Sequence, residues 1–421
     1  MFGRGETAGT AKKGDGMDLE FVRRQFPALD TDWIFFENAG GTQVPAAVME
    51  RAAHLFREGY VQPGYEYPQS ERAAETLQQA RRFVADWIHA PSPDQIIFGP
   101  SATALNRLLA AALAHQWNQG DEILVTVSDH EANVNPWMFL QKYGLRVKFW
   151  PINRETCELD LEDLGRLLSE RTVLVALPHV SNLLGLENDI PAIARKVHEA
   201  GAWIYVDGVA SAPHRPVDVS GWDLDFFVFS TYKTFGPHMA ALYGKREILL
   251  RLPSPNHFFL GNTLPLKFEL GTPNLEGAAA LLGVRDYFAN LAAHHRVSAM
   301  EKGWPGVLKL ISDHETVLAR RLIGGLQALP KVKIIGSTDP STGARRVPVV
   351  SFAVSGRNPE VLARRLAKEK VAVGWGHFYA YRLVEFLGYL KQGGVLRASL
   401  VHYNTLEEID RFCEALDRAL P

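Results

Sequence analysis

The feature that most constrains the fold of this chain is an alternation of short apolar runs with helical patterns between about residues 45 and 290. The runs are β-branched and aromatic and lack a polar face, as strands buried on both sides do. They lie at residues 123–127, 147–150, 173–177, 203–206 and 226–229. Helical spacing occurs between them, as at residues 70–90 and 190–200. This order predicts an α/β protein with a mostly parallel sheet sandwiched by helices.

The rest of the chain predicts a smaller C-terminal α/β unit. A long helical pattern covers residues 301–329, and shorter strand and helix patterns alternate after it, at residues 347–354, 359–370, 371–374, 395–400 and 405–420. A chain of 421 residues is also longer than one compact core usually is. We expect four parts: a flexible leader at 1–16, an N-terminal segment at 17–44 that packs on the small domain, a large domain at 45–295 and a small domain at 296–421.

Charge and composition exclude several classes of partner. The formal net charge is −2, so no overall positive field favours nucleic acid. No apolar stretch approaches the roughly 18 residues that a membrane helix needs, and the first 16 residues lack the apolar core of a signal peptide. The 2 cysteines, Cys157 and Cys413, do not make a disulfide framework. We therefore expect a cytoplasmic protein that binds neither nucleic acid nor membrane.

Two predicted strands end in residues that can ionise or react. Asp207 closes the run at residues 203–206, and Lys233 follows the run at residues 226–229. In open α/β sheets, ligands bind beyond the carboxyl ends of the strands, so both side chains should face one crevice. A structural ion pair would account for them equally well at this point.

Chemistry with pyridoxal 5′-phosphate (PLP) requires this pair of residue types. A lysine amine condenses with the aldehyde of the cofactor, and a carboxylate keeps the pyridine nitrogen protonated so that the ring accepts electrons. The lysine must lose its proton to react, and burial near other cations lowers its pKa. Lys233 and Asp207 are therefore candidate catalytic and cofactor-binding residues.

The sequence around Lys233 resembles the class V aminotransferases, in the cysteine desulfurase-like branch of PLP fold type I. Residues 230–237 read Ser-Thr-Tyr-Lys-Thr-Phe-Gly-Pro, similar to the family's Ser-x-His-Lys-x-x-Gly-Pro. The resemblance runs from about residue 36 to residue 410, with further motifs in the family's order. It implies a large PLP-binding domain followed by a small α/β domain, with PLP held by Lys233.

The resemblance also implies how the phosphate is bound. A small-residue loop before a predicted helix corresponds to the family's Gly-Thr-Thr loop and contains Ser101, Ala102 and Thr103. Backbone N–H groups at a helix start suit a phosphate. Ser230 would bind the phosphate beside Lys233. The segment from Glu269 to Asn274 matches Glu-x-Gly-Thr-Pro-Asn, whose threonine reaches the neighbouring subunit's phosphate in this family. A homodimer in which Thr272 contributes to the partner's site is therefore implied.

Three further positions would contact the cofactor ring. Residues 129–137 resemble the family's Glu-His-x-Ala-Asn-x-x-Pro-Trp, so His130 would stack on the ring and could relay protons. Asn182 lies in a segment like Val-Ser-Asn-x-x-Gly and would reach the phenolic oxygen or the substrate. Tyr232 replaces the family histidine before the lysine and can still hydrogen-bond. Ala210 replaces a family glutamine, so the electronic properties of the cofactor should differ.

Substrate contacts are implied by two further motifs and one loop. Asn38 and Ala39 lie in a segment like Asp-Asn-Ala-Ala, which lines the substrate pocket in the family. Arg397, in a segment like Arg-x-Ser-x-x-x-Tyr-Asn-Thr, would bind an α-carboxylate through its guanidinium fork. His377 and Tyr379 lie on the loop over the substrate and would select it.

One departure from the family pattern affects the predicted reaction. Tyr379 occupies the place of the desulfurase cysteine, and Gly374 stands where that branch often has arginine. Neither Cys157 nor Cys413 is placed in sequence to receive sulfur. We expect a PLP enzyme that acts on an α-amino acid through an external aldimine. Its favoured reaction is a desulfurase-like C–S or C–Se lyase reaction without a persulfide cysteine.

Other functions stay open from the sequence alone. An amino-acid epimerase or racemase and a class V aminotransferase would use the same Lys233, Asp207 and Arg397. A non-catalytic scaffold with this fold is a further alternative, because fold does not guarantee activity. No metal site is expected, because His130 and Glu131 are not part of an HExxH pattern and no cysteine pair is present.

Overall fold

The computed structural model describes residues 16–298, 304–338 and 346–420, and the predicted leader lies outside them except for Gly16. Within these residues, seven strands form the larger sheet, in the order β2 (Ile96–Gly99), β8 (Ala240–Gly244), β7 (Phe226–Ser230), β6 (Trp203–Asp207), β5 (Thr172–Pro178), β3 (Glu122–Thr126) and β4 (Arg146–Trp150). The five strands from β7 to β4 are parallel, whereas β8 is antiparallel to both of its neighbours. The predicted α/β class with a mostly parallel sheet is confirmed.

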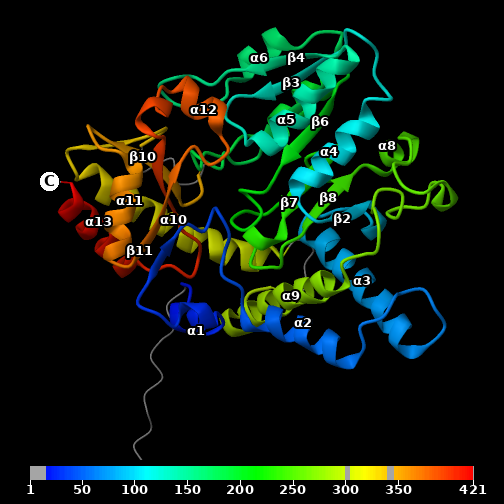
Figure 1. The fold of residues 1–421 in the computed structure, drawn as a ribbon, viewed down its shortest axis with the longest axis horizontal. Coiled ribbons are helices and arrows are strands. Elements are labelled where there is room, and N and C mark those ends of the chain that lie inside the picture. The colour runs from blue at the N-terminus through cyan, green and yellow to red at the C-terminus, as the bar shows by residue number, and fades with distance from the viewer. Residues whose placement is uncertain (1–15, 299–303, 339–345, 421) are drawn as a thin grey trace, which may run out of the picture.

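Helices cover both faces of this sheet, because the strands are apolar on both faces. Along β6, Ile204 and Val206 pack in one core cluster together with side chains of α3 (Pro68–Trp87), α7 (Ile190–Glu199) and α9 (Leu275–His295). Tyr205, between them, packs in a second cluster with α4 (Ala102–Leu113) and α5 (Glu131–Phe139). Around these lie α2 (Ala46–Glu58), α6 (Leu161–Leu167) and α8 (Arg246–Arg251). Figure 1 shows α2 and α9 running together below the sheet.

A smaller five-stranded sheet lies beside the first within the described residues. Its order is β1 (Ile34–Phe36), β11 (Val371–Gly376), β12 (Val395–Ser399), β10 (Val349–Val354) and β9 (Val332–Ile334). Four helices accompany it: α10 (Pro305–Gln327), α11 (Pro359–Lys368), α12 (Tyr381–Phe386) and α13 (Leu406–Ala419). Thr405 caps α13 in a capping box with Glu408.

The N-terminal segment joins the smaller sheet. After α1 (Leu19–Arg24), β1 pairs in parallel with β11, with Ile34 opposite Val371. The long helix α9 ends at His295, and the elements from β9 onward extend the smaller sheet. We propose residues 295 and 296 as the domain boundary on this basis, with 17–44 as a segment that packs on the small domain.

Strand direction determines where functional side chains gather. The chain leaves β3, β5, β6 and β7 at one edge of the larger sheet, and that edge faces the smaller sheet. Asp129, Asn182, Asp207 and Lys233 all follow closely after, or end, one of these strands.

Candidate active site

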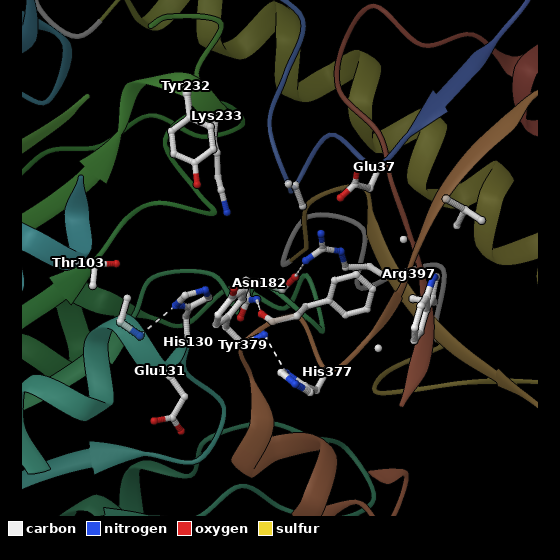
Figure 2. Close-up of a pocket in the computed structure, with 18 of the residues that line it drawn as sticks. Glu37, Thr103, His130, Glu131, Asn182, Tyr232, Lys233, His377, Tyr379 and Arg397 are labelled. Atoms are coloured by element: carbon white, nitrogen blue, oxygen red, sulfur yellow. Dashed lines mark hydrogen bonds between the residues drawn. The ribbon is translucent and has the colours of Figure 1, made fainter. Parts of the chain in front are cut away.

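A cavity of about 1080 Å³ opens at this edge, between the two sheets. Side chains from both domains line it, including Ala39, Thr103, His130, Asn182, Tyr232, Lys233, His377, Tyr379 and Arg397. A narrower cavity of about 70 Å³ shares several of these residues and adds Ser101, Ala102, Asp207 and Ser230. Most of the residues singled out in the sequence are therefore brought together, and Figure 2 shows Lys233, His130 and Arg397 directed into one space.

Lys233 stands on a short 3₁₀ turn after β7, one strand away from Asp207 at the end of β6. Burial, the largest cause, and the charge of Arg397 lower the pKa of Lys233 to about 8, against the opposing effect of the carboxylates of Asp207 and Glu37. A lysine with this pKa is partly neutral near neutral pH, as condensation with an aldehyde requires.

Asp207 is a buried carboxyl at the base of the narrower cavity. The pKa of Asp207 is raised to about 6, because burial outweighs the Val209 backbone N–H, 2.8 Å from Oδ1, and the charge of Lys233, which both lower it. Asp129 is buried near it, and burial together with the charge of Asp207 raises the pKa of Asp129 as well. A protonated ring nitrogen in this cavity would stabilise the ionised form of Asp207.

His130 is held in one orientation at the start of α5. Its Nδ1 accepts a hydrogen bond from the Ala132 backbone N–H at 3.0 Å. Burial, the largest cause, together with the positive charges of Lys233 and Arg397 lowers the pKa of His130 to about 4. The ring is therefore neutral at physiological pH, with its proton on Nε2, and is suited to cover an aromatic cofactor.

The predicted phosphate end lies where β2 leads into α4. The Ser101 side chain accepts a hydrogen bond from Ala104 N at 3.1 Å and caps the helix, so the following backbone N–H groups form an anion-binding helix start. Thr103 is exposed to the cavity, and Ser230 lies buried across from this loop in the narrower cavity.

Arg397 is 3% exposed and projects from β12 into the wider cavity. Its Nη1 donates to the Asn182 backbone oxygen at 3.0 Å, whereas its buried Nε has no partner among the described residues. Burial lowers the pKa of Arg397 to about 10, and the carboxylate of Glu37 partly offsets this. The buried Oδ1 of Asn182 likewise has no partner in this part of the chain. Two unpaired polar atoms in one cavity indicate a ligand that supplies the missing contacts.

The structure places two predicted residues outside this cavity. Asn38 is buried, and its amide nitrogen donates to Phe35 O, Ser399 O and Asn404 Oδ1, so it joins β1 to β12 instead of lining the pocket. Thr272 is exposed beside a separate cavity of about 320 Å³. Its loop is fixed by Glu269, which pairs with Arg81 at 2.5 Å.

Four residues that the motif comparison left without a role also belong to the site. Glu37 and Arg107 line the wider cavity, Asp129 lines the narrower one, and Phe378 lies against Arg397. For Asp129, its position next to His130 was the available signal. Nothing local in the sequence identifies Phe378, because its contact depends on a strand and a loop that meet only in the fold.

Neither cysteine faces this cavity. Cys157 is buried and lines a different cavity, together with Ser128 and Ser181. Cys413 lies in α13, where burial raises its pKa to about 11.

Among the described residues, no group of histidine, cysteine and acidic side chains is arranged to hold a metal ion. In the same residues, no helix is both long and apolar enough to cross a bilayer.

Comparison with known proteins confirms the predicted family and the PLP type I fold. The aminotransferase class-V family matches residues 34–412. The aminotransferase-like protein FGM3 of Gibberella zeae is 39% identical over 411 residues, which cover 96% of this chain and 98% of that protein. A cysteine desulfurase of Cronobacter sakazakii is 33% identical, with 95% and 98% covered. Apo cysteine desulfurase from Thermococcus onnurineus NA1 superposes with a TM-score of 0.85 at 28% identity, with 95% and 98% covered.

Proposed function

The chain belongs to the class V aminotransferase family and is a PLP-dependent enzyme, and we propose that it cleaves a C–S or C–Se bond in an α-amino acid. The observation that carries the proposal is the absence of cysteine from the described residues that line the cavity, where Tyr379 is present instead. Without a thiolate there, sulfur would leave as free sulfide and not as an enzyme persulfide.

The residues of the cavity fit PLP. We assign one group of them to the phosphate and a second group to the ring. Ser101, Ala102, Thr103 and Ser230 would hold the phosphate, with Asn182 and Tyr232 toward the ring oxygen. When bound, PLP supplies an electron sink for the pair left at the substrate Cα after its proton is removed. Asp207 would face the ring nitrogen, and His130 would cover the ring as a neutral aromatic.

Five side chains would handle the substrate. Lys233 would hold the cofactor and then take the Cα proton, for which a pKa of about 8 is well suited. Arg397 would bind the α-carboxylate with the part of its guanidinium that lacks a partner. His377 and Tyr379 would contact the side chain of the substrate, together with Ala39, which lines the same cavity.

A substrate screen in deuterated water tests the proposed reaction. The purified enzyme would be incubated with cysteine, selenocysteine, cysteine conjugates and alanine. Cysteine and water should yield pyruvate, ammonia and hydrogen sulfide. Deuterium at Cα without product would instead indicate an epimerase or racemase, and a keto acid with the amine form of the cofactor would indicate a class V aminotransferase. A protein that stays colourless with added PLP would be a scaffold.

We also propose a homodimer in which Thr272 completes the partner's site. Large apolar side chains are exposed on this loop and on a segment that Asn256 links to it, through a hydrogen bond from its Nδ2 to Glu269 O at 2.7 Å: Phe258 is 93% exposed, Phe259 70% and Leu270 58%. Exposed large apolar side chains grouped in this way are typical of interfaces between proteins. Replacement of Phe258 and Phe259 by aspartate should give monomers in light scattering and weaken PLP retention.

The two unpaired cysteines support a reducing, cytoplasmic location.

A further inference from the structure

The loop between β11 and α12 is held in an unusual backbone conformation. Phe378 and Tyr379 have φ angles of 51° and 57°, in the left-handed region. Bulky residues avoid this region because Cβ crowds the backbone, and two in succession persist only where surrounding contacts impose them. The contacts that hold this loop therefore indicate what it does.

Phe378 closes a ring of contacts with the predicted carboxylate-binding arginine. The guanidinium carbon of Arg397 lies 4.0 Å from the centroid of the Phe378 ring. The Phe378 carbonyl accepts a hydrogen bond from Asn182 Nδ2 at 2.9 Å, and the Asn182 carbonyl accepts one from Arg397 Nη1 at 3.0 Å. Three residues from three separate segments thus fix one another, and Figure 2 shows Asn182 beside Arg397.

The Phe378 ring fits there because residue 374 is glycine. Gly374 pairs with Arg397 across β11 and β12, and a Cβ at Gly374 would come within 2.6 Å of Phe378 Cε1. Any larger side chain at this position would force the ring away from the guanidinium. Glycine at 374 and phenylalanine at 378 therefore act as one unit.

The next residue ties the same loop to the large domain. The Tyr379 ring stacks on His130 with centroids 5.3 Å apart, and its carbonyl accepts from Glu131 N at 2.8 Å. Glu131 in turn pairs with Arg382 of α12 at 2.8 Å. The loop is thus anchored on both sides of the cavity, and Phe378 cannot move away from Arg397 without breaking these contacts.

We propose that Phe378 is a positioning residue: its ring occupies the space that Gly374 leaves, holds the guanidinium of Arg397 in place and thereby sets the affinity of the site for an α-carboxylate. This inference rests on the proposed function. A guanidinium that is buried and hydrogen-bonded on one side only has rotational freedom to lose, and an aromatic face restricts it while favouring its charge. The unpaired Nε is then kept free for the substrate.

The test compares two ligands that differ by the carboxylate alone. The PLP-loaded full-length protein would be titrated with L-alanine and with ethylamine, and binding would be read from the cofactor absorbance. In Phe378→Leu and Phe378→Ala, the affinity for L-alanine should fall roughly tenfold, while that for ethylamine stays within about twofold. Tyr381→Phe, on the exposed start of α12, is the control and should match the parent for both ligands.

A double-mutant cycle tests the dependence on Gly374. Gly374→Ala should weaken L-alanine binding about as much as Phe378→Ala does, and the double variant should be no weaker than either single variant. Additive losses would overturn the inference, as would equal losses for L-alanine and ethylamine, or a Phe378→Leu variant with parental affinity.

The proposed function is judged by a different readout. In kinetics, Phe378→Leu should raise KM and leave kcat within about twofold, because the change acts on carboxylate binding. A parent enzyme that binds L-alanine but releases no sulfide from any substrate would refute the lyase proposal and leave the positioning role standing. A parent that binds no α-amino acid would overturn both.

Discussion

Asp207 and Lys233 act on each other's protonation from adjacent strand ends: the charge of Lys233 lowers the pKa of Asp207, and the Asp207 carboxylate raises that of Lys233. Burial works against both charges. The pKa values of both groups are therefore shifted from their ordinary ranges, as those of functional ionisable groups often are.

Asp207→Asn should separate cofactor attachment from catalysis. The amide keeps the size of the side chain and leaves Lys233 in place, so PLP should still attach. It cannot stabilise a protonated ring nitrogen, and kcat should fall about a hundredfold, equal to about 2.7 kcal/mol of barrier. Steady-state kinetics on a preloaded enzyme measure this. Asp313→Asn, on the exposed face of α10, is the matched control. An unchanged kcat would remove Asp207 from the proposed mechanism.

The pH dependence of PLP attachment should follow Lys233. With a pKa of about 8, the neutral fraction rises about tenfold per pH unit below that value and levels off above it. The rate of covalent loading, trapped by borohydride and read by mass spectrometry, should follow the same curve.

Two substitutions should move the midpoint of that curve in opposite directions. Arg397→Met removes a cation that lowers the pKa of Lys233, so the midpoint should rise. Asp207→Asn removes an anion that raises it, so the midpoint should fall. Shifts of the same sign would show that the loading rate reports another group.

Sulfide release should not depend on either cysteine residue of the enzyme. In Cys157→Ala/Cys413→Ala, release of sulfide from L-cysteine should stay within about twofold of the parent, because neither thiol lines the cavity. Loss of the buried Cys157 side chain should cost about 1 kcal/mol of unfolding free energy, seen as a small drop in Tm. A variant with normal Tm and no sulfide release would restore a cysteine to the mechanism.

The sequence predicted the interior of the larger sheet well, because its parallel strands are apolar on both faces. The run at 173–177 became β5, Thr172–Pro178, and the run at 203–206 became β6, Trp203–Asp207. The antiparallel strands β2 and β8 were not predicted. β2 has only 4 residues, and alanine and glycine fill three of the 5 positions of β8, which have low strand propensity. Pairing of β1 with β11 joins segments from opposite ends of the chain, which no local pattern reports.

The candidate site was predictable where motifs report local structure. Asp207, Lys233 and His130 each end or follow a parallel strand of the larger sheet, so their convergence followed from strand direction. Arg397 lies in the middle of β12, in the smaller sheet, and was indicated by its motif alone. Asn38 shows the limit: its motif suggested a pocket residue, but three amide hydrogen bonds direct its side chain into the join between β1 and β12.

Tyr379 offers a way to separate stacking from backbone strain. Its ring covers His130, while its φ of 57° is costly for any residue with a Cβ. Tyr379→Phe should retain PLP as the parent does, since the phenyl ring stacks equally. Tyr379→Ala and Tyr379→Gly should both lose PLP faster in a dilution assay. Between these two, glycine should be the more stable by about 1 kcal/mol in urea unfolding, because it adopts the left-handed region without strain. Equal stabilities would mean that the loop relaxes once the ring is removed, and faster PLP loss from Tyr379→Phe would point to the hydroxyl instead of the stack.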